Sequence, residues 1–269
     1  MRELILLKIG GSVCTQKSAG KFRVRYGPVA RIAAEIAVAQ KQRPFRLVVV
    51  NGAGPFGHVN VLRYDINEGL RTARDFEGFA KTVADCAYLN WRVAEILRRK
   101  GVLSYPLPSS SVVIQSRKKI SSFCADAIRN LWASSEDMVP VMNGTMVPDV
   151  GLGGSVVSGD AVIEHLANAM ATSLIVFATD VDGIFTADPR KNARARLVPE
   201  VTKENFDRLR KGISGSAGAD VTGGMLGKAE RLLSLACPSV IVNGNRPGRV
   251  GDALAGRPVR GTVIKPSRP

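Results

Sequence analysis

The sequence has few of the residues that most often hold metals or form disulfide bonds. Its 269 residues include only two histidines and four cysteines, and the cysteines (Cys14, Cys86, Cys124 and Cys237) never have the C-x-x-C spacing. These counts argue against a zinc site and against a disulfide framework. Scattered single thiols are typical of chains that work in a reducing compartment, so we expect a cytoplasmic protein.

Long hydrophobic runs are also absent. No segment reaches the length that a membrane-spanning helix needs, and the apolar stretch at 4–9 is interrupted by Lys8 and followed by two glycines. We interpret this stretch as a first strand rather than a signal peptide, and we expect no membrane partner. Hydrophobic residues make up 45% of the chain and charged residues 23%, which is typical of a globular domain.

Acidic residues are scarce relative to basic ones. The chain has 38 Lys and Arg against 23 Asp and Glu, which gives a formal net charge of +15. Such a balance occurs in nucleic-acid-binding proteins. Here, however, the basic residues are scattered, no aromatic residues are interleaved with them, and no nucleic-acid motif is present. We interpret the charge as solvated surface and as a field that attracts anionic substrates, and we expect no nucleic-acid partner.

Apolar runs alternate with helical periodicity along the chain. Buried strands are predicted at 4–9, 46–50, 138–142, 174–178, 239–242 and 261–264, a hairpin at 146–156, and helices at 26–42, 74–100, 124–133, 159–170, 202–212 and 225–236. This alternation predicts an α/β fold, a three-layer α/β/α sandwich with a largely parallel central sheet. The length fits one domain, residues 1–269, with an acceptor-substrate lobe at 1–172 and a nucleotide lobe at 173–269.

Glycine is what the sequence does have, in five short segments. They are Lys8-Ile-Gly-Gly-Ser12, Asn51-Gly-Ala-Gly-Pro-Phe-Gly-His58, Ser158-Gly-Asp160, Thr179-Asp-Val-Asp-Gly183 and Thr222-Gly-Gly-Met-Leu-Gly-Lys228. A glycine turn between a strand and a helix brings backbone N–H groups close to a phosphate, and lysine adds compact positive charge. Several such turns, with lysines in the first and the last, predict a protein that handles two phosphate groups, as a kinase must.

Two lysines accompany the first segment. Lys8 ends the first predicted strand, and one interpretation places it on the transferring phosphoryl group, with Gly10 and Gly11 around the phosphate. Lys17 follows closely enough to reach the same phosphate. Taken alone, Lys8 also fits an ordinary strand end and Lys17 an ordinary surface lysine.

The segment that ends at His58 carries the sharpest signal. A turn after a strand in which three of six residues are glycine forms a nest for an anion, here made of Gly52, Ala53, Gly54 and Gly57. His58 is placed to donate a hydrogen bond to an acceptor phosphate or alcohol. The other histidine, His165, falls inside a predicted helix and is interpreted as structural.

Aspartates mark the remaining segments. Asp160 opens a predicted helix, where it either caps the helix or fixes two lysines in position and influences Mg²⁺. Asp180, Asp182 and Gly183 follow an apolar strand, where open α/β sheets bind ligands, and they either contact nucleotide or form a turn. Lys228 lies at a helix start and suits ATP phosphates. No Walker A sequence and no protein-kinase H-R-D or D-F-G set is present.

In this order the segments resemble the amino acid kinase family, and the resemblance runs from Lys8 to Gly261. Lys8-x-Gly-Gly-Ser, Thr179-Asp-Val-Asp-Gly and Asp220-Val-Thr-Gly-Gly-Met-x-x-Lys228 are shared broadly in that family. The Gly-x-Gly-x-Phe-Gly-His58 element and Val157-Ser-Gly-Asp160 are similar to the members that phosphorylate isopentenyl phosphate, with fosfomycin kinases as relatives. The resemblance implies ATP-dependent conversion of isopentenyl phosphate to isopentenyl diphosphate, in an archaeal-type mevalonate pathway, by a homodimer.

The resemblance also implies roles for single residues. ATP phosphates would be bound by Lys8, Gly10, Gly11 and Lys228, and the nucleotide would be contacted by Asp180 and Gly223. Lys17 would stabilise the transferring phosphoryl group, and His58 would hydrogen-bond the acceptor phosphate. Substrate phosphate or nucleotide would be contacted by Ala53, Gly54 and Gly159. Mg²⁺ would bridge ATP oxygens with few protein ligands.

Three positions depart from the family pattern. Asn51 stands where histidine is frequent, Pro55 where serine is usual, and Thr145 where aspartate usually follows glycine. These departures concern the acceptor more than ATP, so the alternatives are a kinase of another small phosphate or phosphonate and a non-catalytic nucleotide-binding protein. A hydrophobic substrate tail needs an apolar slot, which we look for along Phe76, Phe79, Val83 and Ala87; the second interpretation of that stripe is core.

Overall fold

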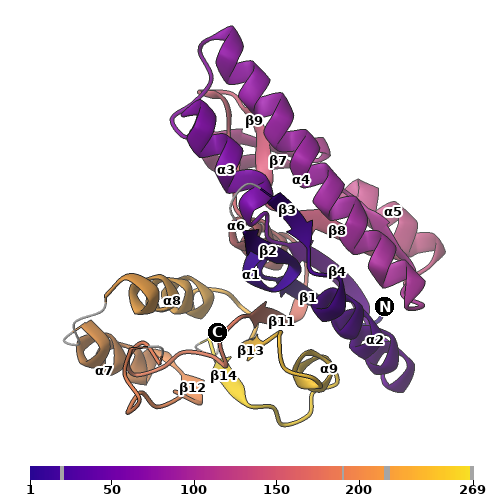
Figure 1. The fold of residues 1–269 in the computed structure, drawn as a ribbon. Coiled ribbons are helices and arrows are strands. Elements are labelled where there is room, and N and C mark those ends of the chain that lie inside the picture. The colour runs from indigo at the N-terminus through magenta and orange to yellow at the C-terminus, as the bar shows by residue number, and fades with distance from the viewer. Residues whose placement is uncertain (19–20, 190, 215–218, 267–269) are drawn as a thin grey trace.

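The structure, a computed structural model, describes residues 1–18, 21–189, 191–214 and 219–266. Its main sheet has eight strands in the order β12-β14-β13-β11-β1-β4-β8-β5 (Figure 1). In that order the strands are Glu200–Val201, Gly261–Ile264, Ser239–Asn243, Thr172–Thr179, Leu4–Ile9, Arg46–Asn51, Val139–Asn143 and Ser104–Pro106. The strands from β13 to β5 are all parallel, and β14 pairs with β13 in the antiparallel sense.

Both faces of this sheet are buried, because alternate residues of each strand enter different cores. In β1, Ile5 and Leu7 pack in one core, while Leu4 and Leu6 pack in the other. The first core is covered by α2 (Tyr26–Gln42), α4 (Ala73–Arg99) and α9 (Arg249–Leu254). The second is covered by α5 (Asp126–Ser134), α6 (Gly159–Ala169), α7 (Lys203–Ser214) and α8 (Ala219–Leu233). The predicted three-layer α/β/α architecture is therefore confirmed.

Helix α4 is the longest helix among the described residues, and its start and end follow from its sequence. Thr72 and Asp75 form a capping box: the Thr72 hydroxyl accepts from the Asp75 nitrogen at 3.3 Å, and the Asp75 carboxylate accepts from the Thr72 nitrogen at 2.8 Å. The helix stops before Gly101, whose φ of 87° suits glycine. Its length lets α4 pack against the main sheet at one end and against a smaller sheet at the other.

The smaller sheet has the order β10-β9-β6-β7, formed by Gly153–Val157, Thr145–Asp149, Val113–Ser116 and Lys119–Phe123. The predicted hairpin at 146–156 is confirmed as the antiparallel pair β9–β10. A further hairpin, β2 (Thr15–Ser18) with β3 (Lys21–Val24), and helix α3 (Pro55–Tyr64) were not predicted. In Figure 1 the β9 and β7 region lies at the opposite end of the molecule from α7 and α8.

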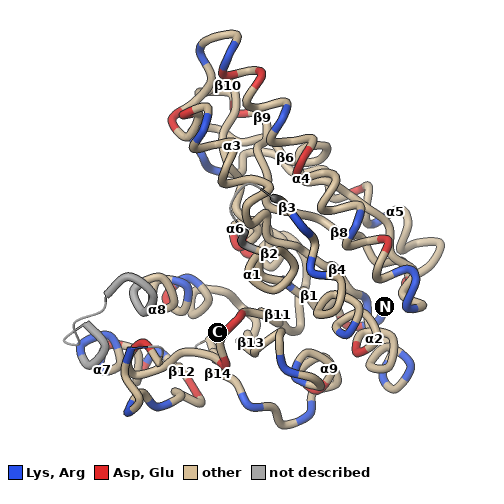
Figure 2. Tube along the Cα trace, viewed as in Figure 1, with Lys and Arg blue, Asp and Glu red and all other residues tan. Residues whose placement is uncertain are grey.

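Three of the five glycine segments, at 8–12, 51–58 and 179–183, follow strands of the main sheet at one edge. Strands β1, β4, β8 and β11 are parallel, so the turns that follow them lie at the same carboxyl edge. Charge is not gathered in this way, because Figure 2 shows Lys and Arg along helices, strands and loops throughout the chain. Among the described residues, no helix combines the length and apolarity needed to cross a membrane.

Candidate active site

The turns after β1 and β4 approach each other so closely that only glycine fits, and so do the turns after β8 and β10. A Cβ atom on Gly11 would lie 2.8 Å from the nitrogen of Gly54, and one on Gly144 would lie 2.9 Å from the nitrogen of Gly159. Gly54 also has a φ of 52°, a left-handed value that glycine adopts freely. The glycines thus bring several stretches of backbone within reach of one ligand.

Three helices begin at this cluster of turns, and the first of them is the four-residue α1 (Gly11–Cys14). Helix α3 starts at Pro55 after the cap residue Gly54, and α6 starts at Gly159 after Ser158. A helix start offers free backbone N–H groups and partial positive charge, which favours phosphate. Proline at the first helical position suits α3, although it removes one of those donors.

Asp160 joins two lysines from distant parts of the chain. Its carboxylate oxygens lie 2.7 Å from Lys8 Nζ, at the end of β1, and 3.0 Å from Lys228 Nζ, on α8. Ser158, not Asp160, caps α6, since its hydroxyl accepts from the Ala161 nitrogen at 3.0 Å. Of the two interpretations of Asp160, the geometry therefore matches the one in which it fixes lysines.

The electrostatics of this cluster follow from its burial. Burial alone would raise the pKa of Asp160, but the positive charges of Lys8 and Lys228 outweigh it and lower that pKa to about 2. Burial lowers the pKa of Lys228, and the charge of Lys8 lowers it further, while Asp160 opposes both effects. The Lys228 ammonium also lies 4.8 Å from the ring centroid of Phe177. The cluster carries two cations for one anion, so it retains positive charge for a ligand.

A cavity of about 810 Å³ opens beside this cluster. Its polar side includes Lys8, Asp160, His58 and the turns at 11–12, 52–54 and 144–145. His58 lies in the first turn of α3 and its side chain is exposed. The apolar part of the lining is formed by Val59, Val61, Met146, Val156 and Val157. The cavity therefore offers a single ligand both polar groups that suit a phosphate and apolar side chains that suit a hydrocarbon.

Phe79 and Val83 do not line this cavity. They pack against Ile66, Leu70 and Met146 in a small third core. Met146 belongs both to that core and to the cavity wall, so Phe79 and Val83 lie behind the wall. The contribution of α4 to the lining is Thr82 instead.

The segment after β11 forms a compact turn, in which the Thr179 hydroxyl donates to Val181 O at 2.9 Å. Asp182 accepts from Asn243 Nδ2 at 2.9 Å and from Arg260 Nε at 3.0 Å. Burial would raise the pKa of Asp182, but these hydrogen bonds lower it below its ordinary value. A side chain on Gly183 would collide with the Thr262 hydroxyl, whereas Asp180 is exposed. Asp182 and Gly183 thus shape the turn, and Asp180 is the member left open to solvent.

Lys17 and Gly223 are two further predicted site residues. Lys17 belongs to β2 and Gly223 to α8, but the Lys17 side chain and the surroundings of Gly223 lie outside the described residues. Gly10 donates its N–H to Ala178 O at 2.8 Å, and so joins the turn after β1 to β11. Gly57 lies in the first turn of α3 and lines the cavity.

The described residues offer no dedicated metal cage. Nowhere in the described ranges do three or more His, Cys, Asp or Glu side chains gather to hold a metal ion. The Asp160 oxygens are already paired with lysines. A Mg²⁺ ion at this site would therefore depend on oxygens supplied by a nucleotide.

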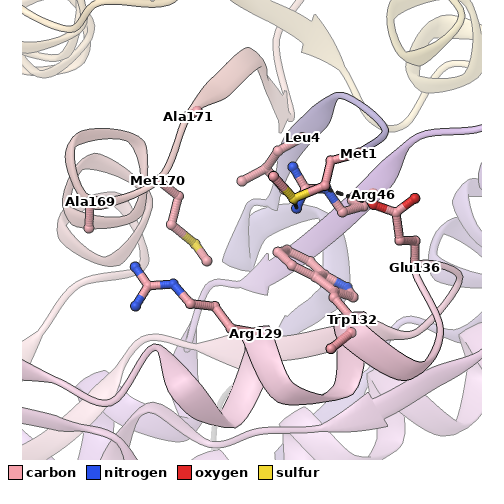
Figure 3. A pocket seen from close by; sticks show the side chains of 10 residues that line it. Met1, Leu4, Arg46, Arg129, Trp132, Glu136, Ala169, Met170 and Ala171 are labelled. Atoms are coloured by element: carbon pink, nitrogen blue, oxygen red, sulfur yellow. Dashed lines mark hydrogen bonds and ion pairs between the residues drawn. The ribbon is translucent and has the colours of Figure 1, made fainter.

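A second cavity, of about 700 Å³, lies at the amino edge of the sheet and differs in chemistry (Figure 3). Its Arg46 lies 5.0 Å from the Trp132 ring centroid and 3.8 Å from Glu136, and its Arg129 lies 3.5 Å from Asp126. It contains no glycine turn, and both arginines have acidic neighbours. We therefore assign the candidate active site to the cavity at the carboxyl edge.

Residues 3–243 match the model of the amino acid kinase family, and the chain belongs to that family. It is 36% identical to the isopentenyl phosphate kinase of Methanothermobacter thermautotrophicus, with 97% of this chain and 98% of the relative covered. The isopentenyl phosphate kinase of Methanocaldococcus jannaschii is 30% identical, with 97% and 98% covered. A solved structure titled "X-ray structures of isopentenyl phosphate kinase" superimposes with a TM-score of 0.82 at 33% identity, covering 98% of this chain and all of that one. The family predicted from the motifs is confirmed.

Proposed function

We propose that this protein transfers the γ-phosphoryl group of ATP to isopentenyl phosphate and so forms isopentenyl diphosphate and ADP. The observation that carries the proposal is Asp160 paired with Lys8 and Lys228 beside a cavity lined by both glycine turns and apolar side chains. Full-length similarity to isopentenyl phosphate kinases supports the same acceptor. The reaction would belong to an archaeal-type mevalonate pathway.

On the donor side, Lys8 and Lys228 bind the ATP phosphates together with the backbone of Gly10 and Gly11. Asp160 binds one ammonium group with each carboxylate oxygen and so fixes both of them, so that they need not reorganise when charge develops on the transferring group. Lys17 stabilises that group. Phosphoryl transfer needs little covalent chemistry from the protein, because positioning and charge stabilisation supply most of the rate.

On the acceptor side, the turn at 52–54 and His58 bind the phosphate of isopentenyl phosphate. The amides of this turn and the start of α3 favour an anion, and His58 adds a side-chain donor. The attacking atom is an oxygen of a phosphate that is already anionic, so no strong general base is required. His58 therefore acts by orienting the acceptor.

The apolar wall of the cavity receives the isopentenyl tail. Val59, Val61 and Met146 face the same cavity as His58, so a ligand held by its phosphate can extend along them. Each buried methylene group contributes about 0.8 kcal/mol, which is enough for a short branched tail to discriminate against inorganic phosphate.

Mg²⁺ reaches the site as Mg-ATP in this proposal. When bound, it neutralises charge on the phosphate oxygens, and the protein supplies few ligands to it. The residues of the site meet this requirement, because their carboxylate is committed to lysines rather than to a metal.

We also expect a cytoplasmic homodimer. All four cysteines are unpaired, as is typical of a reducing compartment. Large apolar side chains on α3 and α4, among them Leu62, Tyr88 and Trp91, are exposed and are available to a second copy. Sedimentation of the purified protein tests the dimer directly.

The deciding experiment measures ADP release from Mg-ATP with isopentenyl phosphate, dimethylallyl phosphate, geranyl phosphate, fosfomycin and several amino acids. We expect a kcat/KM for isopentenyl phosphate of about 10⁴ M⁻¹s⁻¹ or more. Turnover of another compound in its place would select a kinase of a different phosphate or phosphonate. ATP binding without turnover of any acceptor would select a non-catalytic nucleotide-binding protein.

A further inference from the structure

Two asparagines end neighbouring strands directly below the cavity. Asn51 is the last residue of β4 and Asn143 the last residue of β8, and they are register partners in the parallel sheet. Both are buried, with exposed fractions of 0% and 1%. The next residues, Gly52 and Gly144, line the cavity. Hydrogen bonds that hold the Asn51 and Asn143 side chains in place therefore also position Gly52 and Gly144, where two turns of the cavity begin.

Helix α4, which covers one face of the main sheet, forms hydrogen bonds to both asparagines. Asn90, whose exposed fraction is 0%, donates from Nδ2 to Asn51 Oδ1 at 3.1 Å and to Val141 O at 2.8 Å. Asn143 donates in turn from Nδ2 to Cys86 O at 3.2 Å. Cys86 and Asn90 are one helical turn apart on α4, so a single face of the helix holds the ends of both strands.

The two turns above are then joined to each other. The Gly144 nitrogen donates to Asn51 O at 3.0 Å, so a backbone hydrogen bond joins the turn after β8 to the last residue of β4. Asn143 is held from the other side as well, because its Oδ1 accepts from the Ser109 nitrogen at 2.9 Å. The hydrogen bonds form a continuous path from α4 to the backbone of both turns.

We propose that Asn90 is a positioning residue for the acceptor side of the site, through its hydrogen bonds to Asn51 at the end of β4 and to Val141 within β8. It touches no substrate; it sets where the backbone amides at 52–54 and 144–145 point. The inference rests on the proposed function for its kinetic consequence, but the positioning itself can be measured without any substrate.

The test compares two substitutions with a matched control. Asn90→Asp is nearly isosteric but can no longer donate, and Asn90→Leu removes the polar group without adding charge. Ser104→Ala is the control, because Ser104 donates to Ala94 O of the same helix at 2.8 Å and does not line the cavity. All three remove a hydrogen bond to or from α4, so a general loss of stability affects all three.

Hydrogen exchange provides the first readout. In both Asn90 variants we expect faster exchange in peptides covering 50–58 and 142–147, with unchanged exchange at 174–180 on β11. Ser104→Ala is expected to leave all three regions unchanged. Unchanged exchange at 50–58 and 142–147 in folded Asn90 variants would overturn the proposal, whatever the substrate of the protein is.

Calorimetric binding provides the second readout. We expect the dissociation constant of isopentenyl phosphate to rise about tenfold or more in both Asn90 variants, and that of a non-hydrolysable ATP analogue to change less than about threefold. An equal loss of both affinities would overturn the assignment to the acceptor side. If wild-type protein does not bind isopentenyl phosphate, the proposed acceptor is wrong, and hydrogen exchange still decides the positioning role.

Discussion

A Cβ atom on Gly52 would lie 2.6 Å from the backbone nitrogen of Gly11. Those two residues follow β4 and β1, which are neighbours in the sheet. The contact is between backbone atoms, so it cannot be relieved by turning a side chain. The proposed donor turn and the proposed acceptor turn are therefore mutually fitted, and a change in one displaces the other.

The first prediction follows from this contact. Gly52→Ala should lower the melting temperature and reduce turnover by about two orders of magnitude or more, since even small misplacement of reacting groups is costly. Thermal unfolding and steady-state kinetics measure the two effects. Gly27→Ala is the control, because no atom lies within 4 Å of a Cβ built there, in the first turn of α2. That variant should be neutral or stabilised; an equal loss in both would contradict the role of the contact.

The second prediction concerns the charge of Asp160. Asp160→Asn should reduce kcat by about 10²-fold, because two buried lysines lose their shared anion. It should also lower the pKa of Lys228 further, since burial and Lys8 already lower it and Asp160 opposes them. Lysine loses its charge as pH rises, so ATP binding in the variant should weaken at a lower pH than in wild type. Calorimetric titration with ATP between pH 6 and pH 9 checks the direction.

The third prediction separates the role of Lys17 from that of ATP binding. Lys17→Ala should sharply lower kcat while leaving ATP affinity nearly unchanged, because the charge is assigned to the transferring phosphoryl group. Rapid-quench kinetics and equilibrium binding of ATP give the two quantities. A large loss of ATP affinity with normal kcat would contradict the assignment.

The fourth prediction concerns His58. His58→Ala should damage use of the phosphate acceptor by about two orders of magnitude, as expected for the loss of one aimed hydrogen-bond donor. The KM for ATP should remain near its wild-type value. Initial rates with each substrate varied in turn separate the effects, and wild-type kinetics would remove His58 from the site.

The fifth prediction concerns acid stability and Asp149 in the smaller sheet. Burial would raise the pKa of this carboxyl, but hydrogen bonds lower it to about 2. The donors are the backbone nitrogens of Arg117, Lys118, Gly151 and Leu152 and the hydroxyl of Ser155. An unfolded aspartate has a pKa of about 3.9.

The folded pKa is the lower one, so Asp149 stabilises the protein above about pH 4 and loses that contribution as pH falls toward 2. Asp149→Asn should therefore unfold at lower urea concentration than wild type at pH 7, and the difference should shrink between pH 5 and pH 2. Asp126→Asn, at an exposed ion pair, is the control and should have little effect at any pH. A difference that does not depend on pH would contradict the prediction.

Most of the main sheet could be predicted because its central strands are short, mainly apolar runs. Helix α2 was predicted at its observed bounds, Tyr26–Gln42, from the apolar stripe on one face. The hairpin β2–β3 could not be found in this way, because Thr15–Ser18 is polar throughout and the strands are stabilised by each other. Helix α3 was hidden by the glycine motif, whose last residues, Pro55 to His58, form its first turn.

The site was predicted in part for a similar reason. Lys8, Asp160 and Lys228 were each found from their local motifs, but only the fold brings their charged groups within hydrogen-bonding distance. The apolar wall was sought on α4, where periodicity is clear, but the residues that line it come from α3 and the β9–β10 hairpin. Asn90 did leave a signal: it is a polar residue in the buried stripe of α4, between Leu89 and Val93.

The close contact between the glycine turns also limits which parts of the site can change in evolution. The backbone amides at 11 and 52 offer no side chain to exchange, so a substitution at either position damages the turns instead of adjusting their specificity. The apolar lining at Val59, Val61, Met146 and Val156 differs, because each of these residues has a side chain that a substitution can change. Mutation can therefore change the apolar lining while the glycine turns stay the same. One fold could then serve a series of acceptors that share nothing but a phosphate.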